Sequence, residues 1–211
     1  MADARPEGGA RRVLIATRSA HKLGELRALL DLPATELVSL DDLGMPGDAV
    51  EDGPTFEANA LIKARWGLAA TGLPTLADDS GIEVEAIGWA PGVRTRRYAG
   101  EAASDTDNNT KLLAALAGLP PERRRAHYVC VLAFIGAANG DPVIARGVFE
   151  GRIAAGPRGD GGFGYDPIFE PASQPAGGRT VGQMSAAEKN AMSHRALAAQ
   201  AMARALRARG Y

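Results

Sequence analysis

The stretch HYVCVLAFIGAANGDPVIARGVF, residues 127–149, decides the fold. Its first part, residues 127–137, is nearly continuously apolar, which is typical of a strand buried on both faces. Asn139-Gly140 is the strongest hairpin signal in the chain, and the partner strand is expected at residues 143–149. The sequence therefore predicts a central sheet that contains one long antiparallel hairpin.

Upstream of this hairpin, expected strands alternate with expected helices. Leu23, Leu26 and Leu30 have helical spacing, and Thr55 and Gly72 can begin and end another helix. Interleaved elements followed by a long hairpin predict an α/β fold with a mixed sheet rather than a purely parallel one. Further strands are expected at 12–16, 36–40 and 73–77, and helices at 22–30, 55–71, from Ser104 or Asp105 to Gly118, and 185–209, where Ser193 can cap a second helix.

The chain reads as one domain. Residues 1–11 are expected to form a disordered extension, and residues 12–211 contain neither a linker nor a repeat that would divide them. The 211 residues are 45% hydrophobic and 23% charged, which is ordinary for a soluble protein. A formal net charge of −1 favours neither nucleic acid nor a membrane as a partner, and no apolar stretch is long enough to span a bilayer. We therefore expect a cytoplasmic enzyme.

Two adjacent acids, Asp78 and Asp79, lie in the segment LADDSGIEV at 76–84. Repulsion and loss of hydration oppose such a pair, and a bound cation such as Mg²⁺ would remove the objection. Neighbouring residues of a strand point to opposite faces, so both carboxylates can face one cleft only if the chain turns. Ser80-Gly81 is predicted to supply that turn, ahead of a second strand-like segment at 82–86.

Lysine is rare in this chain, which makes each lysine informative. The turn TRSAHK at 17–22 joins a strand to a helix N-terminus, where free amides and the helix dipole favour an anion. Lys63 shares a helix face with Asn59, next to an acidic loop at 44–54. An ordinary N-cap turn and a solvated helix face are the alternative interpretations. The four lysines are Lys22, Lys63, Lys111 and Lys189.

The loop GDGGFG at 159–164 matches G-x-G-x-x-G, but it lacks the preceding strand and following helix that a dinucleotide motif needs. Its glycines allow close approach to a ligand, with the ring of Phe163 beside it. A flat ligand stacked on that ring is preferred to a plug in the core. Cations suit a polyanion, acids suit Mg²⁺ and a ring suits a base, so the combination predicts a nucleoside triphosphate site.

In order along the chain, these segments resemble the inosine triphosphate pyrophosphatase family, the Ham1-like enzymes that hydrolyse non-canonical purine nucleoside triphosphates. The resemblance implies an α/β fold with an elongated, twisted mixed sheet flanked by helices, and two lobes with the active-site cleft between them. It also implies a homodimer and Mg²⁺-assisted hydrolysis of ITP, dITP or XTP to the monophosphate and pyrophosphate, by attack of water at the α-phosphorus. The segments that carry it are LIATRSAHKLGEL, EDGPTFEANALIKAR, LADDSGIEV, APGVRTRRYAG, GDGGFGYDPIF and AAEKNAMSHRAL.

The resemblance also implies roles for individual residues. Asp79 matches the proton acceptor, and Glu51, Asp78 and Asp79 match the metal-binding acids, although which of the two aspartates binds metal and which activates water is left open. Arg195 is a candidate donor to the 6-oxo group of inosine or xanthine. The residues expected to bind substrate are Thr17, Arg18, Ser19, Ala20, His21, Lys22, Lys63, Ser80, Phe163, Gly164, Tyr165, Asp166, Lys189, His194 and Arg195.

Four positions depart from the family pattern: Ser19, Ala58, Arg96 and Ala196. They affect the expected ranking of substrates rather than the acids, lysines or aromatic loop. Two other functions are weighed against this one. A Maf-like pyrophosphatase would prefer modified pyrimidine nucleotides, and a non-catalytic regulator would bind the nucleotide without needing a crowded acidic cluster.

Overall fold

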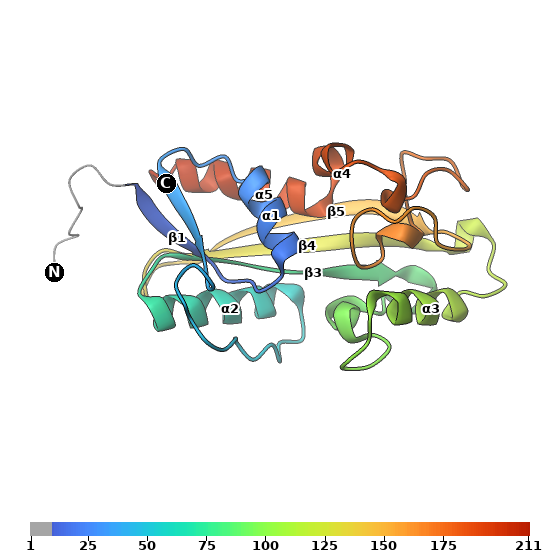
Figure 1. The fold of residues 1–211 in the computed structure, drawn as a ribbon, viewed down its shortest axis with the longest axis horizontal. Helices are drawn as coiled ribbons and strands as arrows, with labels where there is room; N and C mark the ends of the chain where they lie inside the picture. Colours follow the sequence, from blue (N-terminus) through green and yellow to red (C-terminus); the bar gives the residue numbers. More distant parts are fainter. Residues whose placement is uncertain (1–9) are drawn as a thin grey trace.

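A computed structural model describes residues 10–211. Most of the extension predicted for residues 1–11 lies outside the described residues, and Arg11 is already the first residue of strand β1 (Arg11–Ile15). The molecule is elongated, and strand β1, with which the described chain begins, lies at the same end of it as the C-terminus (Figure 1).

The predicted α/β fold with a mixed sheet is confirmed. Six strands lie in the order β2-β1-β3-β4-β5-β6, with β1 parallel to β2 and β3 and the remaining pairs antiparallel. The predicted hairpin is the β4–β5 pair, joined through a turn in which Gly140 N donates to Ala137 O. The other strands are β2 (Thr35–Ser39), β3 (Thr75–Val84), β4 (Arg125–Ile135), β5 (Val143–Ile153) and β6 (Phe169–Pro171).

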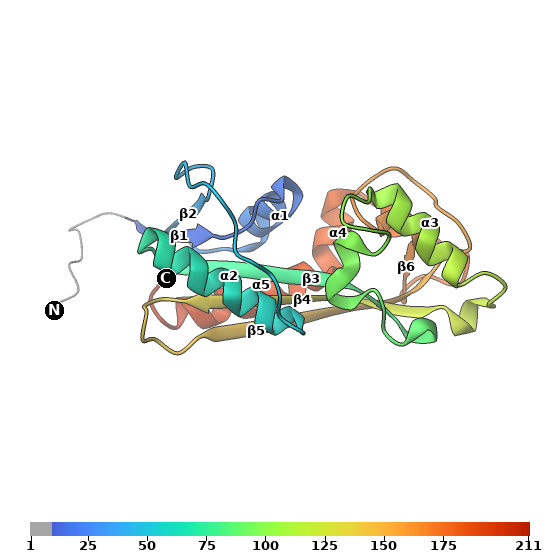
Figure 2. The ribbon, with the colours of Figure 1, turned by 90° about the horizontal axis from the view of Figure 1, so that it is seen from below.

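Helices cover both faces of the sheet. Helices α1, α4 and α5 lie on one face, and α2 and α3 lie on the other (Figures 1 and 2). They are α1 (Ala20–Leu29), α2 (Phe56–Thr71), α3 (Asp105–Ala115), α4 (Ala186–Met192) and α5 (His194–Arg207). Short 3₁₀ helices join these elements: η1 (Glu85–Ile87), η2 (Gly92–Arg97), η3 (Pro121–Arg123), η4 (Asp166–Ile168) and η5 (Val181–Gln183). Within residues 10–211, none of the helices has both the length and the apolar character that a membrane span requires.

Capping residues set the helix ends that the sequence predicts. The Thr55 hydroxyl accepts from Ala58 N at 3.1 Å, and Gly72, at φ 71°, ends the same helix, α2. Ser104, rather than Asp105, caps α3. Ser193 adopts an extended conformation between α4 and α5 and caps the second of them, so the C-terminal helical segment is two helices.

The turn predicted at Ser80-Gly81 is wrong. Strand β3 runs without interruption for ten residues, and each of them pairs with β4. Gly81 serves another purpose: a Cβ there would lie 2.7 Å from the carbonyl oxygen of Gly92 and 2.9 Å from Cβ of Thr95. Because η2 packs this closely on the strand, only glycine fits, and the side chains of Asp78 and Asp79 point to opposite faces of the sheet.

The core divides along the length of the sheet. One hydrophobic cluster lies between the sheet and helices α1 and α5, on the sheet face that contains Leu76 and Cys130. A second lies between the sheet and α2, on the opposite face, which contains Ala77 and Val131. A third cluster fills the far end, between α3, β6 and the loops that follow. We call the end with β1, β2, α1, α2 and α5 the first half and the end with α3, α4 and β6 the second half; β3, β4 and β5 run through both (Figure 1).

Candidate active site

A cavity of about 700 Å³ lies where the two halves meet. Strand β1 pairs with β3 only as far as Leu76, so the edge of β3 beyond this point has no neighbouring strand until the bridge between Glu83 and Pro91. The cavity adjoins this open edge, and side chains from both faces of β3 can therefore reach it. All of the predicted site residues line the cavity except Asp78.

One wall of the cavity is the turn between β1 and α1. The Ser19 hydroxyl caps α1 by accepting from Lys22 N at 3.4 Å. Residues 17–22 all line the cavity, at the N-terminal end of a ten-residue helix whose dipole favours an anion. This wall combines backbone amides, two hydroxyls and the ammonium group of Lys22.

Asp78 lies on the face covered by α1 and α5 and is fully buried. Its carboxylate is 3.0 Å from Lys22 Nζ and 3.5 Å from a guanidinium nitrogen of Arg195, and it accepts from the Ser80 hydroxyl at 3.2 Å. Burial alone would raise the pKa of Asp78, but the two cations, with Lys63, hold it well below the ordinary value. Asp78 is therefore ionised and neutralises buried positive charge behind the cavity wall.

Asp79 lies on the opposite face, above α2. It accepts from Asn59 Nδ2 at 3.2 Å and is 3.5 Å from Lys63 Nζ, which is 2.8 Å from Glu51 Oε2. Burial raises the pKa of Asp79, Lys63 and Lys22 oppose that rise, and Glu51 adds to it. Lys63 keeps its charge because the surrounding acids outweigh its burial and raise its pKa.

Glu51 and Asp79 form a donor set that fits Mg²⁺. Both carboxylates converge on the single ammonium of Lys63 and line the cavity. Within the part of the chain that the structure describes, no group of three or more His, Cys, Asp or Glu side chains is arranged around a common metal position. Mg²⁺ is commonly held by one or two carboxylates together with substrate phosphates and water, so two acids suffice if phosphate supplies the rest.

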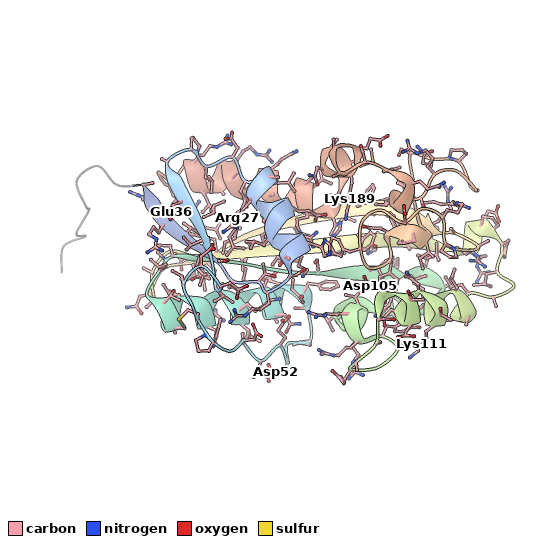
Figure 3. The ribbon with its side chains drawn as sticks, viewed as in Figure 1. Arg27, Glu36, Asp52, Asp105, Lys111 and Lys189 are labelled. Carbon is pink, nitrogen blue, oxygen red and sulfur yellow. The ribbon has the colours of Figure 1, made fainter. Side chains whose placement is uncertain are left out.

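The opposite wall of the cavity is the aromatic loop. Phe163 stacks on His21, with ring centres 5.0 Å apart and planes 16° apart, and Lys189 Nζ is 4.3 Å from the Phe163 ring centre. The loop is fixed from α3, because Gly164 N donates to Asp105 Oδ2 at 2.7 Å. In Figure 3, Lys189 lies on the α4 side of the sheet and Asp105 on the α3 side, so the loop joins the two layers.

Glu25 is a site residue that sequence reasoning missed. It pairs with Lys189 at 2.9 Å and with the guanidinium of Arg195, which is 1% exposed. Arg195 also donates to the Ser80 hydroxyl at 2.9 Å, and Lys189 is 2.8 Å from Asp166. The available signal was the position of Glu25 three residues after Lys22, which places both on one face of α1.

Tyr165 and His194 line the cavity and are both buried. The Tyr165 hydroxyl donates to the backbone oxygen of Thr95 at 2.7 Å, which fixes η2 to the second half. His194 stacks on Tyr128, with ring centres 4.7 Å and planes 9° apart. Its Nδ1 has no hydrogen-bond partner among residues 10–211. Burial, together with the cations Arg195 and Lys189, lowers the pKa of His194 well below 6.5, so the imidazole is neutral.

Acidification should therefore weaken the fold through His194. The unfolded chain binds a proton near pH 6.5 that the folded protein does not, so the free energy of unfolding falls as the pH drops through that value. From pH 7.5 to 5.5 this single group should cost up to about 1.4 kcal/mol. Urea denaturation at both pH values measures it, and the His194→Gln variant should lose this part of the dependence. An equal pH dependence in both proteins would contradict the assignment.

The four positions that depart from the family pattern have identifiable places. Ser19 caps α1, Ala58 N donates to the cap of α2, and Ala196 is fully buried with its N donating to the Ser193 hydroxyl. Arg96 is exposed on η2 and lines the cavity. The four residues therefore lie in the cavity lining or at the helix ends beside it, and none of them takes the place of a site acid or lysine.

Comparison with known proteins gives consistent matches. The Ham1 family model matches residues 13–205. A dITP/XTP pyrophosphatase of Mycolicibacterium paratuberculosis is 48% identical over 205 residues, covering 94% of this chain and 98% of the relative. One from Corynebacterium diphtheriae is 47% identical, covering 90% of this chain and 93% of the relative. The solved structure of a HAM1 protein from Coxiella burnetii is similar with a TM-score of 0.83 and 41% identity, covering 93% of this chain and 98% of that one.

Proposed function

Because the chain belongs to the Ham1 family, we propose that it hydrolyses non-canonical purine nucleoside triphosphates such as dITP, ITP and XTP to the monophosphate and pyrophosphate. The observation that carries the proposal is the set of residues that line the cavity of about 700 Å³. Lys22, Lys63 and two acids line one end, and an aromatic ring with buried cations lines the other. A triphosphate and its base would each meet groups of suitable chemistry.

The triphosphate would lie between the turn at 17–22 and Lys63. The amides at the start of α1 and the ammonium groups of Lys22 and Lys63 are attracted to phosphate oxygens. Lys63 is held between Glu51 and Asp79, so a phosphate that binds it also lies next to those carboxylates.

Asp79 would accept the proton of the attacking water. The water oxygen forms a bond to the α-phosphorus, the bond from that phosphorus to the bridging oxygen of the β-phosphate breaks, and pyrophosphate leaves with the electron pair. Burial raises the pKa of Asp79 in the metal-free protein, which favours uptake of a proton by its carboxylate. Glu51 and Asp79 would hold Mg²⁺, which when bound neutralises charge on the phosphate oxygens and lowers the pKa of nearby water.

The purine base would stack on Phe163, near the donors Lys189 and Arg195. The Arg195 guanidinium lies 5.9 Å from the Phe163 ring centre and is fixed by Glu25 and Ser80. Fixed donors pair with the 6-oxo group of inosine or xanthine, whereas the amino group of adenine would leave them unpaired, which is costly in a buried site. His21 covers one face of the ring in this structure, so a base on that face requires His21 to move.

Pyrophosphate release with Mg²⁺, measured across dITP, ITP, XTP, ATP, GTP, dTTP and UTP, tests the proposal. We expect kcat/KM for dITP, ITP and XTP to exceed that for ATP by at least about 100-fold, because a site built for an oxo acceptor rejects an amino donor. A preference for dTTP or UTP would instead support the Maf-like alternative. Tight binding of ITP without release of pyrophosphate would support the regulator.

Mg²⁺ as the metal, a homodimer and a cytoplasmic location complete the proposal, and the family resemblance supports them. Removal of divalent cations with EDTA should abolish pyrophosphate release, and added Mg²⁺ should restore it. Light scattering should give about twice the chain mass of 21.9 kDa. Cell fractionation tests the location.

A further inference from the structure

Arg18 lies in the phosphate-binding turn, yet its guanidinium points to another segment. Its Nε is 3.2 Å from Asp48 Oδ1, one terminal nitrogen pairs with Asp41, and the other donates to the backbone oxygens of Met45 and of Gly47, the latter at 2.7 Å. Every nitrogen of the group is thus bonded to residues 41–48. Two carboxylates neutralise its charge, so it has little left to offer a phosphate.

The segment that Arg18 holds leads directly to Glu51. Before it, Met45 N donates to Leu40 O at 2.9 Å, and after it, Gly53 N donates to Asn59 Oδ1 at 2.8 Å. Between these points, within the described structure, Arg18 makes all the hydrogen bonds and ion pairs of residues 46–50. Packing does not replace it, because Val50 is 76% exposed.

The loop must be fixed for Glu51 to meet Asp79. Glu51 approaches Asp79 only through their shared partner Lys63, at 2.8 Å and 3.5 Å. Asp48 is three residues before Glu51, so an anchor at Asp48 limits how far Glu51 can move. Arginine suits this anchor better than lysine, because its planar group presents several donors in fixed directions and reaches four acceptors at once.

We propose that Arg18 is a positioning residue that holds the loop at 45–53 and so sets the affinity of the Glu51–Asp79 pair for a divalent cation. It contacts neither the phosphates nor the metal. The part that concerns the metal rests on the proposed function, whereas the part that concerns the loop is independent of it.

The first test is hydrogen exchange in metal-free protein without substrate. Arg18→Ala should speed exchange of the amides of Met45 and Gly53, which are hydrogen-bonded at the two ends of the loop, by at least tenfold and leave α1 and α2 unchanged. Arg27→Ala is the matched control, because Arg27, in α1, pairs with Asp42 just before the loop and does not line the cavity. Unchanged exchange in Arg18→Ala, or an equal effect in Arg27→Ala, would overturn the proposal, whether or not the protein hydrolyses any triphosphate.

The second test separates the metal from the substrate. In Arg18→Ala the Mg²⁺ concentration for half-maximal pyrophosphate release should rise about tenfold, while KM for dITP at saturating Mg²⁺ changes by less than twofold. A tenfold rise in that KM with an unchanged Mg²⁺ requirement would make Arg18 a phosphate ligand and overturn the proposal. If wild-type protein releases no pyrophosphate, the proposed function fails and the exchange result decides the role of Arg18 alone.

A double variant guards against a general folding defect in Arg18→Ala. Asp41→Asn with Asp48→Asn weakens the same anchor while keeping Arg18 in place. It should reproduce the faster loop exchange and the higher Mg²⁺ requirement, and adding Arg18→Ala should change either value by less than twofold. If the effects of Arg18→Ala and of the double aspartate variant on loop exchange and on the Mg²⁺ requirement multiply when they are combined, Arg18 acts independently of the loop, which contradicts the proposal.

Discussion

Replacement of Asp79 by Asn is expected to lower kcat for dITP by about 10²- to 10⁴-fold, the range for loss of a general base. Asn has the same shape, and its side-chain oxygen can still accept from Asn59 Nδ2. It cannot take up a proton, and of the ion pairs that Lys63 makes within residues 10–211 only the one with Glu51 remains. The fold should therefore survive while turnover is lost, which kcat, KM and the melting temperature measured together will show.

Asp52→Asn is the matched control for this variant. Asp52 is exposed and belongs to the same acidic loop as Glu51, but it does not line the cavity and lies at the outer edge of the molecule (Figure 3). Its turnover should stay within about twofold of wild type. Near-wild-type turnover of Asp79→Asn at saturating Mg²⁺ would remove Asp79 from the reaction.

Replacement of Asp78 by Asn is expected to reduce the free energy of unfolding by about 3–5 kcal/mol, the usual cost of breaking a buried ion pair from one side. Asp78 is fully buried, and it neutralises Lys22 and Arg195, which is itself 1% exposed. Without it, within residues 10–211, Lys22 loses its paired carboxylate and Arg195 keeps only its pair with Glu25. Because the pKa of Asp78 is lowered by folding, its contribution is present above the unfolded value near 3.8 and is lost as the pH falls below it.

Urea denaturation at pH 7 measures the effect of Asp78→Asn. Adding Lys22→Met should recover part of the lost stability, because it removes the cation that Asp78→Asn leaves without its paired carboxylate. If the free energy of unfolding fell by less than about 1 kcal/mol, water would be hydrating Lys22 and Arg195, or another acid would be pairing with them, in place of Asp78. The contrast expected with Asp79→Asn follows from the sheet, because the two side chains lie on opposite faces of β3, with Asp78 among buried cations and Asp79 in the cavity.

Much of the fold could be predicted because local signals and tertiary structure agree. The hairpin at 127–149, the cap at Thr55 and the stop at Gly72 each depend on residues close in sequence. The turn at Ser80-Gly81 was predicted wrongly because glycine has two uses. Here it admits the carbonyl of Gly92 against the strand, and no local pattern distinguishes such a close approach from a turn.

The site could be predicted in outline and not in its connections. The resemblance brought the site lysines, the acids and the aromatic loop together, and all of the residues it implied except Asp78 line one cavity. Glu25 was missed because its partner Arg195 lies 170 residues further along the chain, where only the folded structure reveals the pairing. The partners of Arg18 were missed for the same reason, since a cation in a phosphate-type turn carries no sign of an acidic loop 23 to 30 residues away.

The continuous pairing of β3, β4 and β5 has a mechanical consequence. Two hydrogen-bonded ladders cross from one half of the molecule to the other. The ladder between β3 and β4 runs from Thr75↔Ile135 to Val84↔Ala126, and the ladder between β4 and β5 runs from Arg125↔Arg152 to Phe134↔Val143. A rigid-body hinge between the halves would have to bend all three strands at once, against their hydrogen bonds and the side chains packed on both faces. Adaptation to bound nucleotide is thus left to the segments that cap the cavity, residues 44–54 and 159–164, and free and bound forms should superpose along the strands.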